Sequence, residues 1–416
     1  GLSLYDPSTG KVETLFHVPA GTTLVDAVLQ QDRWVWLSTT NGVWRYDLQE
    51  ESAPLHLYND PSDRNSISGN YVMTLCIDRE GGVWVGTKDG GVSYSGMSQQ
   101  IIRKTDRYPG GTLRNSLVSG FAEDGSGRVW ITTEAGGLFI YNHNSGTLSP
   151  FRPSKGSLPN GLCAPCVDGD RLWLGSLDGL YCLDVKSGAV RRYGTLRRSA
   201  GVSDPRVYVI YRSEDGNLYF ANTLGLFRYD RASDGFVQIP AFDGVFITSM
   251  DETPDGLMWI SSYATGLFVW NPVTSELVCN YRYGDGSGLP TDKISSVFAD
   301  RDGQVWAIGF SSGFAKLDGG HFEVYDSSTI PSLTTGVFFC ARQDADGNLW
   351  LNSDKGLFRF NPHSQALNLY GEFDGLLDEK LTNSSIILGS GEMMVGSDNG
   401  FVLFAPSSFR PLETAP

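Results

Sequence analysis

The sequence is short of charged residues and of long apolar runs, and both shortages exclude classes of protein. Asp, Glu, Lys and Arg make up 19% of the 416 residues, too few for a disordered chain or a coiled coil. No stretch approaches the roughly 18 consecutive apolar residues of a membrane-spanning helix, and no signal peptide is visible. Basic residues are outnumbered by acidic ones, 32 to 47, which gives a net charge of −15. We therefore expect this segment to contact neither nucleic acid nor membrane.

The motifs of common catalytic and metal centres are also missing. There is no Gly-x-Ser-x-Gly elbow and no phosphate-binding loop. We expect no catalytic residue, no metal and no cofactor. The histidines are scattered, with no two at a spacing typical of a metal site: His17, His56, His143, His321 and His363.

The cysteines include one Cys-x-x-Cys pair, Cys163 and Cys166, without the second pair that a zinc site needs. The pair falls on an expected strand, where Cys166 takes an apolar position of the repeat described below. We expect buried free thiols. A disulfide between the two is the alternative in an oxidising compartment.

Glycine and aromatic residues, in contrast, are abundant. There are 50 Gly, and aromatics reach 12%, which is typical of an all-β chain with tight hairpins. An Asp-x-x-Gly-x-x-Trp pattern followed by Gly-apolar-x-x-aromatic-Asp/Asn recurs every 45 residues or so. Its Trp position is filled by Trp36, Trp84, Trp130, Trp173, Tyr219, Trp259, Trp306, Trp350 and Met394.

Each repeat is expected to form four short strands, as in residues 118–123, 127–132, 137–141 and 148–151. Gly in Asp-Gly pairs such as Asp124-Gly125 and Asp302-Gly303 suits the positive φ of the first turn. A four-stranded unit of about 45 residues is the size of a propeller blade. We therefore predict an all-β fold of the β-propeller class, in which the Trp residues pack between blades.

The phase of the repeat predicts where a ring closes. Nine complete units exceed the usual four to eight blades of one propeller. Two units, seven repeats apart, lack the Asp or Asn after the third strand, at Tyr94-Ser95 and Phe404-Ala405. A closing blade takes its fourth strand from the other end of the ring. We therefore predict a seven-bladed propeller over residues 98–408, with residues 101–104 pairing alongside 400–404. Residues 1–97 would be the last blades of an incomplete first propeller with exposed apolar edges. Since the chain begins inside a repeat and without Met, we expect a piece of a longer protein.

The repeat resembles the two-component regulator propeller repeat, whose consensus is Asp-x-x-Gly-x-[Leu/Ile/Val]-Trp-[Ile/Val]-Gly-Thr, then Gly-Gly-Leu and Tyr-Asp. Similarity covers the chain and is strongest at residues 78–94, 123–141, 300–317 and 344–360. Tyr219, Met394 and Ile308-Gly309 depart from it and put local packing in question. The resemblance implies the periplasmic sensor region of an inner-membrane hybrid histidine kinase of a Gram-negative bacterium. It also implies an oligosaccharide ligand, a homodimer formed through a membrane-proximal domain, and residues 409–416 as a linker to a β-sandwich domain.

Ligand contacts are expected from the connections between blades and from the turn between the second and third strands, because these vary most in length. Arg and Lys there could bind anionic groups and aromatic rings could stack on sugars. Each of them taken singly is more typical of a solvated loop residue than of a ligand contact. The candidates are Tyr108, Arg114, Asn115, Glu134, Arg206, Tyr263 and Lys293.

Two other functions stay open. The Asp-x-x-Gly-x-x-Trp element is similar to the Asp-box of sialidase-like propellers, so a polysaccharide hydrolase or lyase is one alternative, although the element itself stabilises a turn and carries no chemistry. A protein-interaction scaffold is the other, weakened by the lack of Gly-His and Trp-Asp signatures.

Overall fold

A computed structural model of the chain describes residues 1–49, 53–61, 66–79, 81–96, 102–113, 116–194, 196–197, 203–310, 313–333, 337–371, 374–376 and 380–409. The chain divides into two compact units, with the boundary between Ile101 and Ile102 and the second unit ending at Phe409. The sequence places these boundaries at 97/98 and 408/409. Phe409 is 6% exposed and packs on Trp350 and Phe404, so it belongs to the second unit and not to a linker.

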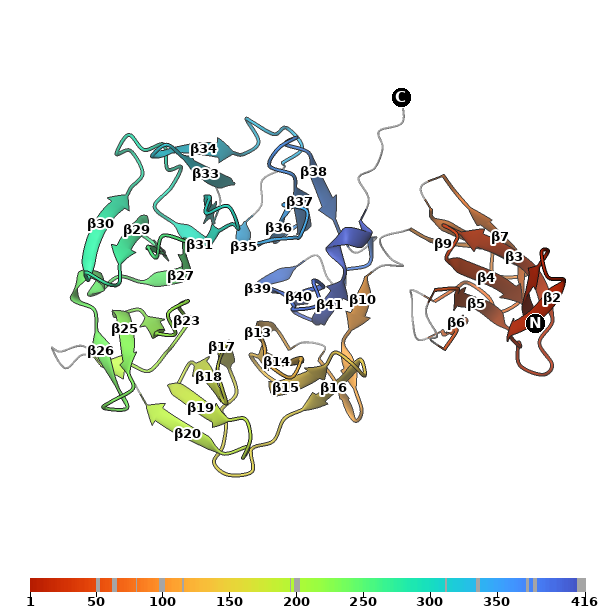
Figure 1. The fold of residues 1–416 in the computed structure, drawn as a ribbon, viewed down its shortest axis with the longest axis horizontal. Helices are drawn as coiled ribbons and strands as arrows, with labels where there is room; N and C mark the ends of the chain where they lie inside the picture. Colours follow the sequence, from red (N-terminus) through yellow and green to blue (C-terminus); the bar gives the residue numbers. More distant parts are fainter. Residues whose placement is uncertain are drawn as a thin grey trace. The chain divides into compact units, whose positions relative to one another are not determined.

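The second unit is a ring of antiparallel four-stranded sheets, and Figure 1 shows them following one another around a common centre. There are seven such sheets in the described part of this unit. In the first, the strands are β13 (Val118–Glu123), β14 (Arg128–Thr133), β15 (Gly137–Asn142) and β16 (Thr147–Pro150). These bounds lie within one residue of the predicted strands. The all-β propeller fold is confirmed.

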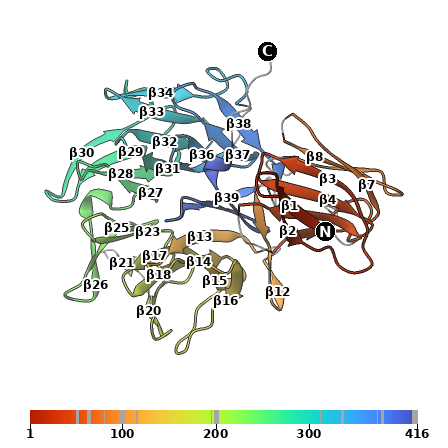
Figure 2. The same cartoon turned by 45° about the vertical axis from the view of Figure 1, so that its right-hand side comes forward.

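The next five sheets repeat this plan, and Figure 2 shows β31 to β34 of one sheet following one another outward. Their strands are β17 (Leu162–Asp168), β18 (Arg171–Ser176), β19 (Leu180–Asp184) and β20 (Val190–Gly194); β23 (Val209–Arg212), β24 (Leu218–Asn222), β25 (Gly225–Asp230) and β26 (Gly235–Gln238); β27 (Ile247–Glu252), β28 (Met258–Ser262), β29 (Leu267–Asn271) and β30 (Glu276–Tyr281); β31 (Ile294–Ala299), β32 (Val305–Gly309), β33 (Phe314–Asp318) and β34 (His321–Tyr325); β35 (Phe338–Gln343), β36 (Leu349–Ser353), β37 (Gly356–Phe360) and β38 (Leu367–Tyr370).

The seventh sheet closes the ring with a strand from the other end of the unit. Its own strands are β39 (Leu381–Ile387), β40 (Met393–Ser397) and β41 (Gly400–Phe404), and its outer strand is β10 (Arg103–Thr105). Arg103 pairs with Leu403, and Lys104 with Val402. The predicted pairing of these two segments is confirmed for the described residues, while Ile101 lies outside them. Closure removes the open sheet edges that would otherwise attract other chains.

Short elements fill the connections. Two small hairpins are β11 (Arg107–Tyr108) with β12 (Gly111–Thr112), and β21 (Leu196–Arg197) with β22 (Ser203–Asp204). Two helical segments within the described ranges are single 3-10 turns, η1 (Pro240–Phe242) and η3 (Pro406–Ser408). No helix in the described residues has the length and apolarity needed to cross a membrane.

In several blades an Asp accepts the hydrogen bond that closes the first turn, and a Gly takes the positive φ of that turn. In the first sheet the amide of Gly127 donates to the Asp124 carbonyl at 3.0 Å, and Gly127 has φ +75°. Gly303 has φ +76° in the equivalent position. The expectation that Gly125 takes the positive φ is wrong, because Asp124 aligns with Asp300 and not with Asp302, so the left-handed position falls on Gly127.

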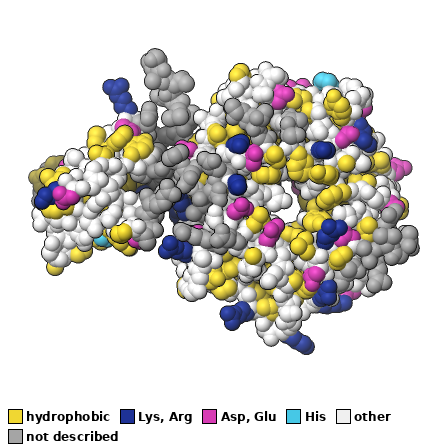
Figure 3. Space-filling model, turned by 180° about the vertical axis from the view of Figure 1, so that it is seen from behind, with side chains coloured by type: hydrophobic (Ala, Val, Ile, Leu, Met, Phe, Trp, Pro, Cys, Tyr) yellow, Lys and Arg dark blue, Asp and Glu magenta, His cyan; other side chains and the backbone are white. Residues whose placement is uncertain are grey.

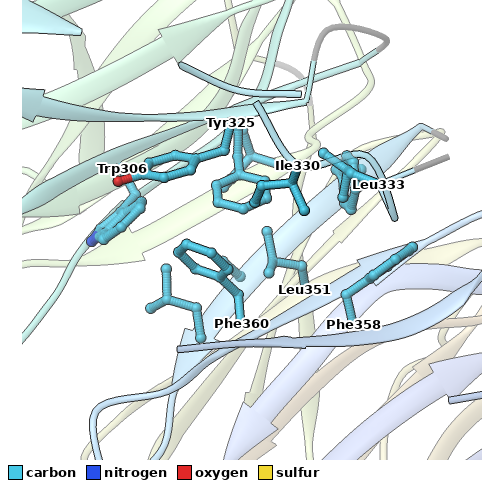
Figure 4. Close-up of a cluster of buried hydrophobic side chains, with 12 residues drawn as sticks. Trp306, Tyr325, Ile330, Leu333, Leu351, Phe358 and Phe360 are labelled. Atoms are coloured by element: carbon cyan, nitrogen blue, oxygen red, sulfur yellow. The ribbon is translucent and has the colours of Figure 1, made fainter. Parts of the chain in front are cut away.

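The Trp position of the repeat fills the space between adjacent sheets, as predicted. Trp130, Trp173, Trp306 and Trp350 are 0–1% exposed, and Trp259 is 7% exposed. Figure 4 shows one such interface, where Trp306 and Tyr325 face Leu351 and Phe360 of the next sheet. The departures from consensus pack equally well: Tyr219, Met394 and Ile308 are at most 1% exposed. Burial of each large side chain stabilises by about 1.5–3 kcal/mol.

Hydrogen bonds between the innermost strands add to this packing. The Ser119 hydroxyl donates to the Leu162 carbonyl of the next sheet at 2.5 Å, and the Ser295 hydroxyl donates to Phe338 at 2.8 Å. Cys163 occupies the same position and its thiol donates to the Val207 carbonyl at 3.1 Å. The second residue of the inner strand thus ties each of these sheets to the next.

The first unit has a four-stranded sheet between two smaller ones. Its strands are β1 (Leu2–Asp6) and β2 (Lys11–Phe16); β3 (Leu24–Gln30), β4 (Trp34–Thr39), β5 (Gly42–Asp47) and β6 (Leu55–Leu57); β7 (Val72–Ile77), β8 (Val83–Thr87) and β9 (Val92–Ser95). Trp36 is 2% exposed beneath the β7–β9 sheet, whereas Trp84 of that last sheet is 44% exposed. The expected exposure of apolar side chains in this unit is therefore observed.

Candidate functional site

One end of every sheet in the ring carries both variable connections. Because neighbouring strands are antiparallel, the turn between second and third strands and the connection to the next sheet emerge at the same end. We call this side of the ring the loop face. Figure 3 shows one face of the molecule, with a central hollow and hydrophobic side chains along part of its rim.

Two positions per sheet form the inner rim of the loop face: the residue before the innermost strand and the first residue of the second turn. A backbone hydrogen bond joins them in several sheets. The Tyr263 amide donates to Phe246 at 3.0 Å, and the Glu134 amide donates to Leu117 at 2.9 Å. The inner strands thereby fix which side chains border the centre of the ring.

Four aromatic side chains on this rim form a continuous row, which we call the aromatic row: Tyr208, Phe246, Tyr263 and Phe310. Tyr208 and Phe246 have ring centroids 5.7 Å apart, and Phe246 and Tyr263 are also 5.7 Å apart. Tyr263 and Phe310 are separated by 5.6 Å. Phe246 is 37% exposed and Tyr263 is 45% exposed. The row therefore presents ring surface to solvent across three consecutive sheets.

Arg206 stands beside the row in a fixed orientation. Its Nε and Nη2 groups donate to the two carboxylate oxygens of Asp204 at 2.9 and 3.1 Å, and its Cζ lies 5.9 Å from the ring centroid of Tyr208. Asp204 is 5% exposed and also accepts a hydrogen bond from the Thr223 hydroxyl. Burial alone would raise the pKa of Asp204, but the bonds from Arg206 and Thr223 lower it below its ordinary value. Asp204 therefore stays ionised and holds the guanidinium in place.

Lys293 lies on the same part of the rim. It precedes β31, is exposed, and places its Nζ 6.0 Å from the ring centroid of Tyr263. The adjacent Asp292 is bonded to Arg282 through two contacts of 3.0 Å. Lys293 and Arg206 thus lie near different ends of the aromatic row.

The structure brings together three of the sequence-predicted candidates: Arg206, Tyr263 and Lys293. Glu134 lies on the loop face in the first sheet, away from the row. Tyr108 packs against Phe139 with centroids 5.2 Å apart and against the core of the first sheet, so we leave it out of the site. Arg114 and Asn115 fall outside the described residues.

Sequence reasoning missed three members of the aromatic row: Tyr208, Phe246 and Phe310. A usable signal is present for each. Phe246 directly precedes an inner strand, Tyr208 directly precedes β23, and Phe310 directly follows a second strand. These positions border the centre of a propeller, so an aromatic residue there is exposed by the geometry of the ring.

Other cavities in the described chain are weaker candidates for a ligand site. One cavity of about 400 Å³ lies at the opposite ends of two sheets, against Asp255, Trp259 and Asp302. Another cavity, of about 460 Å³, is lined in part by Asp178 and Tyr181. The Tyr181 hydroxyl already donates to the Asp178 carboxylate at 3.0 Å. Within the described ranges no group of three or more His, Cys, Asp and Glu side chains could hold a metal ion.

The six cysteines are free, so the alternative disulfide between Cys163 and Cys166 is not formed. Burial raises the pKa of both thiols to about 12, which keeps them protonated and unreactive. The expectation of buried thiols is wrong for Cys76, which is exposed on β7.

Comparison with known proteins finds a family match for one of the repeats. A model of the two component regulator propeller family matches residues 66–89. Histidine kinase P4 of Formosa agariphila is 23% identical over 311 residues, covering 71% of this chain and 22% of that protein. The extracellular domain of BT3049, described as a hybrid two component system of B. thetaiotaomicron, has a TM-score of 0.71 and 18% identity over 98% of this chain and 54% of that one.

Enzymes of the same fold exist as well. A virginiamycin B lyase from Staphylococcus aureus has a TM-score of 0.57 and 12% identity, over 73% of this chain and 98% of that chain. At these identities the structural likenesses establish the fold. Residues 102–409 form a β-propeller, and residues 66–89 match the two-component regulator propeller repeat. The chain resembles the extracellular domains of hybrid two-component systems, and it spans about a fifth of the curated relative and about half of the solved domain.

Proposed function

We propose that this chain is the extracytoplasmic sensing region of a hybrid two-component sensor and that it binds an oligosaccharide on the aromatic row. In the full protein, ligand binding on the periplasmic side would control a histidine kinase across the inner membrane. The homodimer implied by the resemblance would form through a membrane-proximal domain. The repeat and the likeness to sensor domains support the general role.

The aromatic row carries the proposal that the ligand is a sugar. Most large aromatic side chains of the ring pack between sheets, whereas Phe246 and Tyr263 keep 37% and 45% of their surface in water and contact one another there. The apolar faces of sugar rings pack on such surfaces, and a row of rings offers successive places for a chain of sugars. An exposed aromatic patch bounded by polar groups is typical of a binding surface.

The row suits binding better than turnover. A glycosidase needs two carboxylates about 5–10 Å apart, one as acid and one as base or nucleophile. Asp204 lies beside the row, is 5% exposed, and is already bonded to Arg206 and Thr223. It is not free to take a proton from a ligand.

The first prediction is a thermal shift. Oligosaccharide pools from plant, algal and host polysaccharides should raise the unfolding temperature, because a ligand at 100 times its Kd stabilises by about 2.7 kcal/mol. Tyr263→Ala should abolish the shift. Tyr283→Ala is the matched control, since Tyr283 is 70% exposed on the loop face but outside the aromatic row. A full shift in Tyr263→Ala, or none in the wild type with any pool, would contradict the proposed site.

The same incubations decide between binding and catalysis. We expect no new reducing or unsaturated sugar ends after prolonged incubation. Release of shorter products, lost in an active-site variant, would instead support the hydrolase or lyase alternative. Co-purification of a stable protein partner would support the interaction scaffold.

A further inference from the structure

Positive charge accompanies the aromatic row, although the chain as a whole has a net charge of −15. Arg206 lies beside Tyr208 at one end, and Lys293 lies beside Tyr263 toward the other. Lys293 directly precedes the inner strand β31, and Arg206 lies shortly before the inner strand β23. The ring geometry therefore holds both side chains at the rim. Aromatic surface and cations thus share three consecutive sheets.

The charge of Lys293 is not neutralised within the described part of the chain. No carboxylate there lies within 4.0 Å of its Nζ. Its neighbour Asp292 is held by Arg282 and also accepts a hydrogen bond from the Tyr283 amide at 2.8 Å. An exposed ammonium beside an aromatic ring is suited to an anionic group on a ligand that lies on that ring.

Arg206 is held ready for a second contact. Asp204 uses its Nε and Nη2 groups, and the Nη1 group takes no part in that pair. The guanidinium has five N–H donors in a fixed planar arrangement, so donors remain on the edge away from Asp204. Because Asp204 is 5% exposed, its negative charge is shielded from a ligand more than the charge of Arg206 is.

Carboxylates occupy several other positions of the rim. The first residue of the second turn is Glu134 in the first sheet, Asp354 in the sixth and Asp398 in the seventh. Lys355 and Lys380 offset part of this charge. In the fourth and fifth sheets the same position is filled by Tyr263 and Phe310. Cations and exposed rings therefore lie together on the aromatic side of the rim, where an anionic sugar chain could use both.

We infer that the aromatic row selects oligosaccharides that carry a carboxylate or a sulfate group, with Lys293 and Arg206 as the two anion contacts. The sugar rings lie on Tyr208, Phe246 and Tyr263. This inference rests on the proposed function and adds the chemical class of the ligand. A neutral glycan provides no anionic partner for the Lys293 ammonium. Its binding free energy then comes from stacking on the aromatic rings alone.

Matched probes test the ligand class. One pair is an oligogalacturonate tetrasaccharide and its methyl ester, which differ in the carboxylate charge. The other is a sulfated galactan tetrasaccharide and its desulfated form. Calorimetry with the full chain at low salt should give a Kd at least about tenfold lower for the acidic member of one pair, as expected for a charged hydrogen bond. The preferred pair distinguishes a uronic acid from a sulfate ester.

Variants locate the contacts. Lys293→Gln should raise the Kd of the acidic probe at least about fivefold and change the Kd of its neutral counterpart less than twofold. Lys186→Gln is the control, because this substitution removes the same charge at the opposite end of the sheets. Lys186 lies there in the turn after β19. Arg206→Lys should raise the Kd of the acidic probe, although the lysine still provides a cation for Asp204. A higher salt concentration should weaken the binding of the acidic probe and leave the binding of the neutral probe unchanged.

The outcomes separate this inference from the proposed function. Equal affinities within both pairs, together with loss of all binding in Tyr263→Ala, would overturn the anionic class and leave the sugar-binding row in place. Acidic probes that bind equally to wild type and Lys293→Gln would place the charge contact elsewhere and overturn the inference. Absence of binding by all four probes and all pools would overturn both.

Discussion

The Trp of each repeat is fixed by an acceptor six residues before it. Trp130 Nε1 donates to Asp124 at 2.9 Å, Trp306 to Asp300 at 3.0 Å, and Trp350 to Asp344 at 2.8 Å. The same position also works with other acceptors: Gln30 binds Trp36 at 2.7 Å and Thr253 binds Trp259 at 3.2 Å. The conformation of the turn, and not the charge of Asp, therefore sets this contact.

Trp173 is the exception, and its cause is a shorter turn. Val167 stands six residues before it, while Asp168 stands five before it and pairs with Arg171 across a tighter hairpin. Asp168 consequently points to Arg212 and Arg231, and Trp173 Nε1 is buried without a hydrogen-bond partner. Loss of one residue from a turn thus removes the contact while the ring stays buried.

At the residue scale we predict that Asp300→Ala destabilises the ring by about 1–3 kcal/mol, because it leaves the buried Nε1 of Trp306 unsatisfied. Urea denaturation followed by tryptophan fluorescence measures this. Asp302→Ala in the same turn is the control, since Asp302 is exposed and lends only its backbone amide to Asp300. Equal losses in the two variants would show that the Trp contact is not the cause.

At the scale of elements, β10 is the strand on which the ring depends. It is short, with three residues paired to β41. Arg103 also donates to Glu392, which binds His143 of the first sheet through its other oxygen. Burial would raise the pKa of Glu392, but His143 and Arg103 lower it, so the carboxylate stays charged between the two sheets. One residue thus joins the closing strand, the seventh sheet and the first.

We predict that a chain lacking residues 1–105 unfolds about 5–10 °C below a chain lacking residues 1–96, because only the first deletion removes β10 and opens the edge of β41. Calorimetry and light scattering check this. The shorter chain should also self-associate, since an open apolar strand pairs with other copies. Identical unfolding temperatures and no association would contradict the closing role of β10.

At the scale of the whole molecule, acidic side chains couple stability to pH. Burial alone would raise the pKa of Asp124, but bonds from Ser126, Trp130 and Arg128 lower it from 3.8 to about 2. The pKa of Asp234 is lowered to about 2 by hydrogen bonds from Tyr229 and Tyr193. A lowered pKa in the folded state contributes stability above the unfolded value near 3.9, and this contribution is lost as the pH falls toward 2.

We therefore predict that the unfolding temperature falls steeply between pH 4 and pH 2. Asp124→Asn should lower the unfolding temperature at pH 6 and reduce its slope between pH 4 and pH 2, because Asn does not titrate. Scanning calorimetry across this range provides the measurement. A variant whose slope equals that of the wild type would show that Asp124 does not contribute to acid unfolding.

Much of the architecture follows from the sequence because its signals are local and repeated. The spacing of Trp130, Tyr219 and Met394 gives the blade length, and alternation within each unit gives the strands. The missing Asp after Phe404 predicts the strand that closes the ring, since a blade completed from elsewhere needs no further turn. These features depend on near neighbours in the chain.

The candidate site depends on the tertiary structure. Arg206, Phe246 and Lys293 are far apart in sequence, and only the rotation from one sheet to the next places them along one rim. Sequence reasoning named Arg206, Tyr263 and Lys293 one by one but could not group them, and it missed Tyr208, Phe246 and Phe310 because an aromatic residue beside a strand is usually buried. The sequence by itself determined the repeating unit, since six of the seven four-stranded sheets in the described part of the ring pair strands within about 45 residues of one another. The tertiary structure alone decided which side chains meet across blades, because closing the ring sets which ends of the sheets face the same solvent.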